Sequence, residues 1–302
     1  MQGRSLYDPC GQPVVLRGVN EMITFAQDKS GASAYAEIAK SHANSVRILW
    51  RTTDTAPELD LALTNAEAQK LIPLVVVYDD QGGPTLVSMV ADYWTRPDMA
   101  AIAQKHEKWL LIVLREKNVV TQDAPSIWAT KFDTAVSRIR NASVNVPISI
   151  DAPNGGLDID TLRTLALSRI AADPRHNLLL NVNAWWPNYT ADMIKNELTA
   201  ARDSALPLLV GELSGYAQPP NCPSVLFDYT TLLAVAQQTA TGWLAWSWGA
   251  VKNIDCSGYL DMTTDGTYAG LTGWGYNVAV ADANSIQNTS VPAVYTPNDN
   301  CP

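Results

Sequence analysis

The stretch WLLIVLREKNVV, residues 109–120, runs from a continuous apolar segment directly into three charged residues. Its first half has the composition of a strand that is buried on both faces, which is typical of parallel sheets. It then ends in Arg115, Glu116 and Lys117 without a turn residue between. This pattern predicts a buried strand whose carboxyl end opens onto a polar site.

Similar apolar runs recur along the whole chain and alternate with segments of helical periodicity. The eight predicted strands are residues 14–20, 44–50, 72–79, 109–116, 146–152, 178–186, 206–213 and 242–248. The seven amphipathic segments between them are residues 33–43, 58–70, 99–109, 126–142, 160–172, 190–204 and 227–240. Because strand and helix alternate throughout, we expect a parallel sheet.

Eight such units in 302 residues predict a single (β/α)₈ TIM barrel that spans residues 1–302. A doubly wound open sheet is the alternative. It would be favoured by a glycine-rich phosphate loop after the first strand, but LRGVNEMITF (16–25) contains one glycine and no GxGxxG motif. No linker or repeat divides the chain, and no nucleotide cofactor is expected.

Composition and charge limit the partners that the chain could have. With 47% hydrophobic and 17% charged residues it can build a large core, and we expect a monomer. The formal net charge of −9 argues against a nucleic-acid partner, since such binding needs Lys and Arg to neutralise phosphates. No stretch approaches the roughly 18 apolar residues that a membrane helix needs.

The N-terminus and the cysteines bear on the cellular compartment. MQGRSLYDPCGQP (1–13) lacks the layout of a signal peptide, so an exported protein would have lost its signal already. The four cysteines are too scattered for a CxxC motif, and we expect the disulfides Cys10–Cys301 and Cys222–Cys256 in a secreted protein. Four unrelated buried thiols are the alternative.

Polar residues at the carboxyl ends of the predicted strands are the first candidates for a site, since barrel active sites lie there. Two carboxylates, Glu116 and Glu212, follow long apolar runs on strands that would face each other across the mouth. Paired carboxylates of this kind are what glycoside hydrolysis requires. The other candidates are Asn20, Arg47, Tyr78, Asp79, Arg115, Asp151, Asn181, Asn183, Trp185, Trp246 and Trp248.

Tryptophan is abundant at these strand ends. The chain has 10 Trp and 3 Phe, with Trp185 and Trp186 adjacent and three more in GWLAWSW (242–248). Indole faces stack on sugar rings, so this clustering suits a polysaccharide or oligosaccharide cleft. Core packing is the competing explanation and should claim Trp243, while Trp246 and Trp248 cannot easily both be sugar platforms.

The motifs LRGVN (16–20), NSVRI (44–48), LLVGELSGY (208–216) and GWLAWSW (242–248) resemble those of glycoside hydrolase family 5. Within that family they are most similar to the bacterial endo-β-1,4-mannanases, in the same order and over nearly the whole chain. The resemblance implies a retaining, endo-acting β-glycan hydrolase. It also implies that Glu212 is the nucleophile, Arg47 the arginine that orients it and Trp246 the platform beneath the sugar.

The same resemblance puts Glu116 on the acid/base position, when KHEK (105–108) is matched to the charged tetrapeptide before the family's fourth strand. The two carboxylates would then stand about 5 Å apart, as retention requires. The residues expected to bind substrate are Asn20, Arg47, Tyr78, Arg115, Asn183, Trp185, Trp246 and Trp248.

Several of these positions depart from the family. Arg115 replaces the Asn before the acid/base, Tyr78 replaces a His, and Asn183 and Trp185 replace a His-x-Tyr pair. A cation within ~4–6 Å lowers a carboxyl pKa by about 1–3 units, so Arg115 would keep Glu116 ionised if it reached into the cleft. A pseudoenzyme that binds carbohydrate without hydrolysing it is therefore the alternative. A metal enzyme is not expected, since all three histidines lie away from the mouth.

Overall fold

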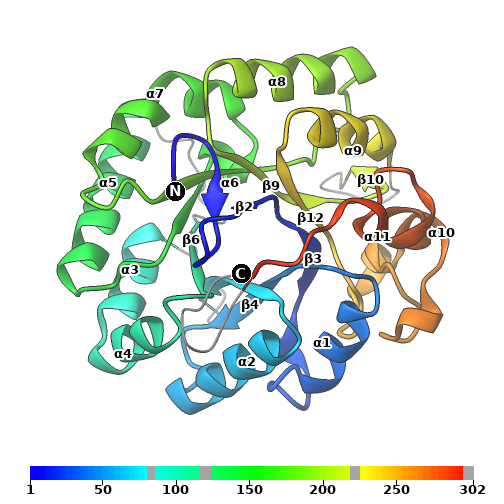
Figure 1. The fold of residues 1–302 in the computed structure, drawn as a ribbon, viewed down its shortest axis with the longest axis horizontal. Helices are drawn as coiled ribbons and strands as arrows, with labels where there is room; N and C mark the ends of the chain where they lie inside the picture. Colours follow the sequence, from blue (N-terminus) through cyan, green and yellow to red (C-terminus); the bar gives the residue numbers. More distant parts are fainter. Residues whose placement is uncertain (80–85, 116–123, 218–224, 295–302) are drawn as a thin grey trace.

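The structure of the protein is a computed structural model that describes residues 1–79, 86–115, 124–217 and 225–294. At its centre eight parallel strands close into a barrel, as predicted (Figure 1). In order around the ring, the strands are β12 (Gly242–Ala245), β3 (Arg17–Glu21), β4 (Ser45–Arg51), β5 (Ile72–Tyr78), β6 (Leu111–Leu114), β7 (Ile148–Asp151), β8 (Leu178–Asn183) and β9 (Leu208–Leu213).

Helices surround the barrel and bury the outward faces of its strands. The longer ones are α1 (Ala32–Ala39), α2 (Ala56–Ala68), α3 (Val87–Thr95), α4 (Pro97–Lys105), α5 (Pro125–Asn141), α7 (Ile159–Ala172), α8 (Ala191–Asp203) and α9 (Tyr229–Gln238). Shorter helical segments are η1 (Ile23–Phe25), α6 (Pro153–Gly156), η2 (Asp255–Leu260), η3 (Tyr268–Gly270), α10 (Gly273–Tyr276), η4 (Asn277–Ala281) and α11 (Ile286–Thr289).

Alternate residues of each strand face the barrel interior and the helices, as strand geometry requires. On β6, Leu111 and Val113 belong to the cluster inside the barrel, whereas Ile112 and Leu114 pack into the larger cluster under the helices. The apolar run 109–114 is therefore buried on both faces, which explains why its sequence lacks alternation. Trp243 is fully buried in the outer cluster, in agreement with its predicted core role.

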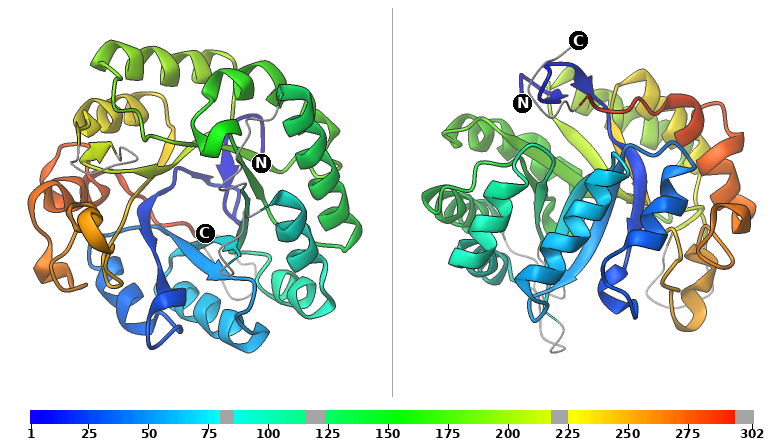
Figure 2. Two further views of the ribbon diagram at one scale, coloured as in Figure 1. Left: turned by 180° about the vertical axis from the view of Figure 1, so that it is seen from behind. Right: turned by 60° about the horizontal axis from the view of Figure 1, so that its bottom comes forward.

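A small hairpin lies across the amino-terminal end of the barrel (Figure 2). It consists of β1 (Leu6–Tyr7) and β2 (Pro13–Val14), and Asp8 ties it to the end of the chain by accepting a hydrogen bond from the Val294 amide at 2.8 Å. The predicted strand 14–20 is thus two strands, β2 and β3. The carboxyl ends of the barrel strands lie at the opposite end and remain clear of this hairpin.

Other boundaries also differ from the prediction. Strands β8 and β12 end at Asn183 and Ala245, so Trp185, Trp246 and Trp248 follow the strands instead of lying within them. Helix α3 was not expected from the sequence; its buried residues include Val90 and Trp94. Within the described ranges no helix is long and apolar enough to cross a membrane.

The pH dependence of stability should show a contribution from His106, which joins α4 to α2. Its ring nitrogens lie 2.6 Å from Glu67 and 2.9 Å from Asp60, and although burial opposes protonation, the two carboxylates raise the pKa of His106. A raised histidine pKa adds stability that is complete below the unfolded pKa near 6.5 and is lost as pH rises through the folded value. We expect His106→Asn to cost about 1.5–3 kcal/mol of unfolding free energy at pH 5 and less at pH 9, measured by urea denaturation.

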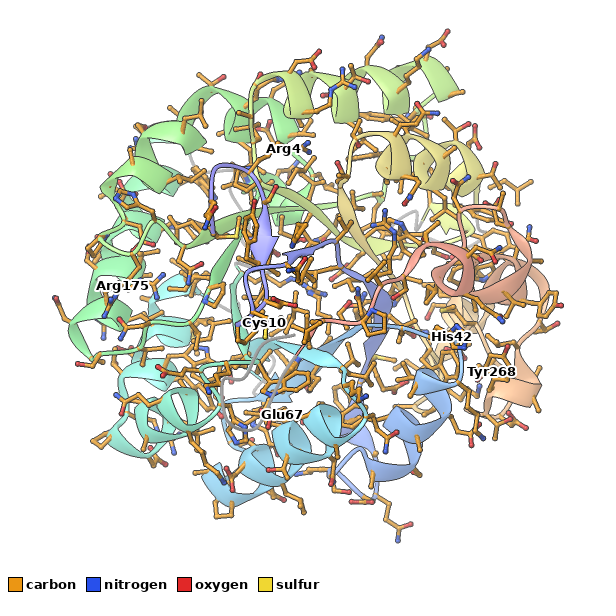
Figure 3. The ribbon with its side chains drawn as sticks, viewed as in Figure 1. Arg4, Cys10, His42, Glu67, Arg175 and Tyr268 are labelled. Atoms are coloured by element: carbon orange, nitrogen blue, oxygen red, sulfur yellow. The ribbon has the colours of Figure 1, made fainter. Side chains whose placement is uncertain are left out.

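His42→Asn is the matched control for this measurement. His42 is exposed in the turn after α1 (Figure 3), and its φ of 66° suits asparagine. A His106→Asn cost that is equal at pH 5 and pH 9 would contradict the ionic role of the ring.

Candidate active site

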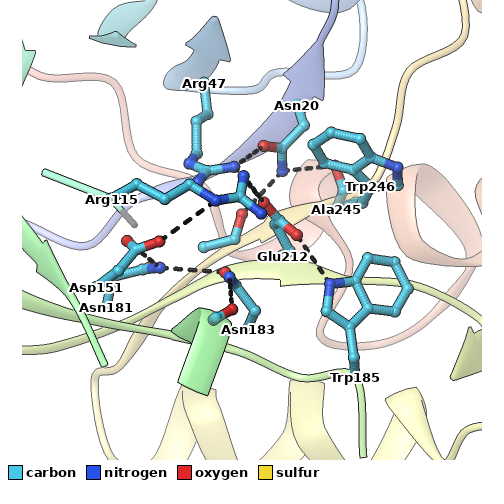
Figure 4. A network of polar contacts seen from close by, with 12 residues as sticks. Asn20, Arg47, Arg115, Asp151, Asn181, Asn183, Trp185, Glu212, Ala245 and Trp246 are labelled. Atoms are coloured by element: carbon cyan, nitrogen blue, oxygen red, sulfur yellow. Dashed lines mark hydrogen bonds and ion pairs between the residues drawn. The ribbon is translucent and has the colours of Figure 1, made fainter. Parts of the chain in front are cut away.

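The charged end of the opening stretch turns into the barrel. Leu111 and Val113 face the interior, and Arg115 continues this alternation by two residues. Its guanidinium reaches Glu212 of β9 and Asp151 of β7, and Arg47 of β4 lies beside it (Figure 4). Glu116 and Lys117 lie outside the described residues. The expected acid/base role of Glu116 therefore stays a prediction.

Glu212, at the end of β9, is held at both carboxylate oxygens (Figure 4). Oε1 accepts hydrogen bonds from Nη1 of Arg47 at 2.7 Å and from Nη1 of Arg115 at 3.0 Å. Oε2 accepts one from Nε1 of Trp185 at 2.8 Å. Only 4% of the Glu212 side chain is exposed, so the carboxylate is fixed in one orientation by three donors.

Asn20 fixes the first of these donors. Its Oδ1 accepts a hydrogen bond from Nη1 of Arg47 at 2.8 Å, and its Nδ2 donates to the carbonyls of Gly211 and Ala245 at 2.9 and 3.2 Å. Neither Asn20 nor Arg47 has exposed surface. In the structure Asn20 holds Arg47 and Arg47 holds Glu212, while the expectation that these two residues bind substrate stays a prediction.

The charges around Glu212 decide its protonation. Burial alone would raise its pKa, but Arg115 and Arg47 outweigh burial and lower the pKa of Glu212 to about 2. The carboxylate is therefore an anion at every pH at which the protein would work. This is the state that a nucleophile needs and that a general acid must avoid.

Asp151, at the end of β7, lies on the other side of Arg115. Its Oδ2 is 3.8 Å from Nε of Arg115, and its Oδ1 accepts a hydrogen bond from Nδ2 of Asn181 at 2.9 Å. Burial raises the pKa of Asp151 to about 6, although Arg47 and Arg115 oppose this rise. Arg115 thus bridges two buried carboxylates, and the stronger acid of the two is Glu212.

Asp151 and Asn181 were recognised as strand-end residues but were given no role from the sequence. They form the second layer of the site together with Asn183, whose Oδ1 accepts from Asn181 at 3.1 Å. Asn183 also donates to the Gly155 carbonyl at 3.1 Å and is fully buried beneath α6. Both ends of the Asn183 amide therefore form hydrogen bonds within the protein, and its expected contact with substrate stays a prediction.

Five of the candidate residues keep some exposed surface: Tyr78, Asp79, Arg115, Trp185 and Trp246. Trp246 donates from Nε1 to Oδ1 of Asn253 at 3.2 Å, which fixes its ring. Trp248, whose expected contact with sugar stays a prediction, is instead 0% exposed and donates to the Gly266 carbonyl at 2.7 Å. The reason is that β12 ends at Ala245, after which strand alternation no longer puts residues 246 and 248 on one face.

The three histidines lie away from this site, as expected: His42 and His176 on exposed turns, and His106 between α2 and α4. In the part of the chain that the structure describes, no group of three or more His, Cys, Asp or Glu could hold a metal ion.

A (β/α)₈ barrel with a fixed, ionised carboxylate and indole rings at its mouth defines the class of O-glycosyl hydrolases. Mannan endo-1,4-β-mannosidase of Cellvibrio japonicus is 31% identical to this chain, over 96% of the chain and 67% of that protein. The Streptomyces lividans enzyme of the same name is also 31% identical, over 93% and 73%. The chain belongs to this family, the endo-β-mannanases of glycoside hydrolase family 5.

Solved structures agree with this assignment. The β-mannanase of Streptomyces thermolilacinus, determined with mannohexaose, is 27% identical, with a TM-score of 0.83 over 97% of this chain and 96% of that one. The catalytic domain of a mannanase from Streptomyces sp. SirexAA-E is 26% identical, with a TM-score of 0.83 over 97% and 92%. No family model matches the chain.

Proposed function

We propose that the chain hydrolyses β-1,4-mannan or a related β-1,4-glucan, within the polymer and with retention, using Glu212 as nucleophile and Glu116 as acid/base. One observation carries this proposal: Glu212 is ionised at the barrel mouth, with Arg47, Arg115 and Trp185 on its two oxygens. The relatives support the substrate class, since they are named as mannan endo-1,4-β-mannosidases and one was solved with mannohexaose.

The reaction would proceed in two displacements. In the first, Glu212 forms a bond to the anomeric carbon while the glycosidic C–O bond breaks and the leaving oxygen takes the proton of Glu116. In the second, water attacks the same carbon, gives its proton to Glu116 and releases Glu212. Each displacement inverts the anomeric centre, so the product retains the starting configuration.

Oε2 of Glu212 accepts one hydrogen bond, from Trp185, and so keeps a lone pair with which it can attack, whereas Oε1 is held by both arginines. Arg47 has 0% side-chain exposure and is anchored by Asn20, whereas Arg115 has 14% exposure. Of the two cations on Oε1, Arg115 is therefore the one that substrate can reach. Tyr78, Trp185 and Trp246 offer the partly exposed aromatic surfaces against which sugar rings could stack.

The test is an assay of reducing-end release from mannan, carboxymethylcellulose, xylan and soluble β-glucan. We expect release from mannan above that of a Glu212→Gln variant, with a fall in viscosity ahead of complete digestion because cleavage is internal. The first anomer seen by proton NMR should be β. An absence of release above the variant on all four polymers would refute the hydrolase function.

A carbohydrate-binding protein without hydrolytic activity is the second candidate. The observation that favours it is the hydrogen bond from Arg115 to Oε1 of Glu212, at the position where the family has an asparagine. Retention of the protein by mannan without product release would support this second function.

We also propose that the protein is a secreted monomer, with polysaccharide as its partner and no nucleic acid, and with the disulfides Cys10–Cys301 and Cys222–Cys256. No free cysteine is found among the side chains that the structure describes, which do not include those of Cys222, Cys256 and Cys301. Iodoacetamide without reductant should label no cysteine, and a tryptic digest should contain both cross-linked pairs. Labelling of all four thiols in the folded protein would contradict this pairing.

A further inference from the structure

A pocket of about 430 Å³ opens beside the cleft and is not used by the reaction above. It lies between Tyr216 of β10 (Tyr216–Ala217, paired with β11, Val225–Leu226), the loop 252–261 and the segment 263–274. The first two follow β9, which carries Glu212, and β12, after which Trp246 comes directly. Helix α10 and β10 lie together at this side of the barrel (Figure 1). The pocket is within the range of about 300–1,000 Å³ that is typical of ligand sites.

Three aromatic rings line this pocket in fixed positions. Tyr216 and Tyr259 meet edge to face with 5.0 Å between their ring centroids. Trp274 donates from Nε1 to the Tyr259 carbonyl at 3.0 Å, which ties α10 to η2. A sugar ring has apolar faces, which stack on aromatic rings, and hydroxyl groups at its edge, which bind polar side chains. Rigid aromatic rings beside polar groups suit both.

The polar lining includes one carboxylate with an unused oxygen. The Asp261 side chain is only 8% exposed, and its Oδ1 accepts from the amide and Nδ2 of Asn253 at 3.1 and 2.6 Å. Among the described residues none donates a hydrogen bond to Oδ2, whose nearest cation is Lys252 Nζ at 4.0 Å. The negative charge of Asp261 and the positive charge of Lys252 cancel, so the pocket suits a neutral ligand with hydroxyl groups.

The pocket also connects to the cleft through hydrogen bonds. Asn253, which Asp261 holds, accepts the hydrogen bond from Nε1 of Trp246 through its Oδ1. Asp261 thus holds Asn253, and Asn253 holds the ring of Trp246. A ligand that binds Oδ2 of Asp261 would therefore be linked to Trp246 through Asn253.

We propose that this pocket is an auxiliary binding site for a neutral β-1,4-linked oligosaccharide segment, outside the cleft in which cleavage occurs. The choice of sugar rests on the proposed function. The rings of Tyr216, Tyr259 and Trp274 stack on the segment, and Asp261 with Lys252 binds its hydroxyls. Its effect is to hold a long polymer next to the cleft.

Gly258 allows the pocket to be filled without backbone strain. It lies in η2, lines the pocket, and a Cβ at this position would meet only the Asn253 carbonyl oxygen, at 3.9 Å. Gly258→Phe should therefore block the pocket, and Gly258→Ala is the matched control. Both are compared in the Glu212→Gln background, so that the polymer is not cut, by native electrophoresis in gels that contain soluble galactomannan.

We expect Gly258→Phe to weaken retardation at least threefold relative to Gly258→Ala, at equal retardation in gels without polymer. Equal retardation of the two variants, or no retardation of the Glu212→Gln parent, would overturn the site. If thermal unfolding shows that Gly258→Phe is misfolded, Tyr216→Ala takes its place, with the exposed Tyr276→Ala as control and the same threefold criterion. If the protein with Glu212 intact cleaves mannan but Gly258→Phe and Gly258→Ala are retarded equally, only the pocket is refuted. If Gly258→Phe weakens retardation but the protein with Glu212 intact does not cleave mannan, only the hydrolase function is refuted.

Discussion

Replacing Glu212 with glutamine is expected to lower kcat on mannan on the order of 10⁴-fold or more, the scale seen when a covalent nucleophile is removed. Glutamine keeps the shape of the side chain but cannot form the glycosyl bond. It also removes the negative charge that Arg47 and Arg115 share at 2.7 and 3.0 Å. The measurement is initial rate of reducing-end release, with purified protein titrated to the detection limit.

The same substitution should reduce stability, because it leaves two buried cations facing a neutral amide. Breaking a buried ion pair costs about 3–5 kcal/mol. The sign with pH follows from the lowered pKa of Glu212: its contribution is present above the unfolded value near 4.5 and is lost as pH falls toward about 2. The stability gap between parent and variant should thus be constant from pH 6 to 8 and should narrow in acid.

A double variant separates the chemical loss from the structural one. Adding Arg115→Asn to Glu212→Gln removes one of the unpaired cations and should recover part of the lost unfolding free energy, but none of the activity. Parental activity in a folded Glu212→Gln protein would refute the nucleophile assignment.

The barrel could be predicted from sequence because its strands are apolar on both faces and recur eight times. The directions of side chains could be predicted only where strand alternation continues. Leu111 and Val113 point inward, so Arg115 does too, whereas the same rule fails for Trp248 because β12 has already ended. Glu212 lies near the end of one strand, β9, so its position could be predicted from the local sequence of that strand.

The supporting shell could not be predicted in the same way. Asp151 and Asn181 come from adjacent strands; the guanidinium of Arg115, which follows β6, lies near Asp151, and Asn181 donates a hydrogen bond to Asp151. Nothing local to either residue indicates that partner. The auxiliary pocket could not be predicted from the sequence either, since Tyr216, Gly258 and Trp274 come from three short elements, β10, η2 and α10, that show no periodicity.

Exchanging Arg115 for asparagine, the residue that the family resemblance implies there, is expected to raise kcat/KM on mannan about tenfold. A hydrogen bond to a charged group is worth about 1.5–3 kcal/mol, and here it stabilises the free nucleophile before reaction. If roughly half of this stabilisation is absent from the transition state, the barrier falls by about 1.4 kcal/mol, which is tenfold in rate. Asp151 tolerates the loss, since its pKa is already about 6 and rises further without Arg115.

The pH profile distinguishes this electrostatic effect from a steric one. Of the two arginines, Arg115 lowers the pKa of Glu212 more. Its removal should therefore move the acid limb of the kcat/KM profile upward from near pH 2. Arg115→Lys keeps a cation in the cleft and should leave both the limb and the rate close to those of the parent. A rise in rate for both variants would point to relief of crowding, and a fall to the Glu212→Gln level in Arg115→Asn would show that Arg115 supports the nucleophile instead of restraining it.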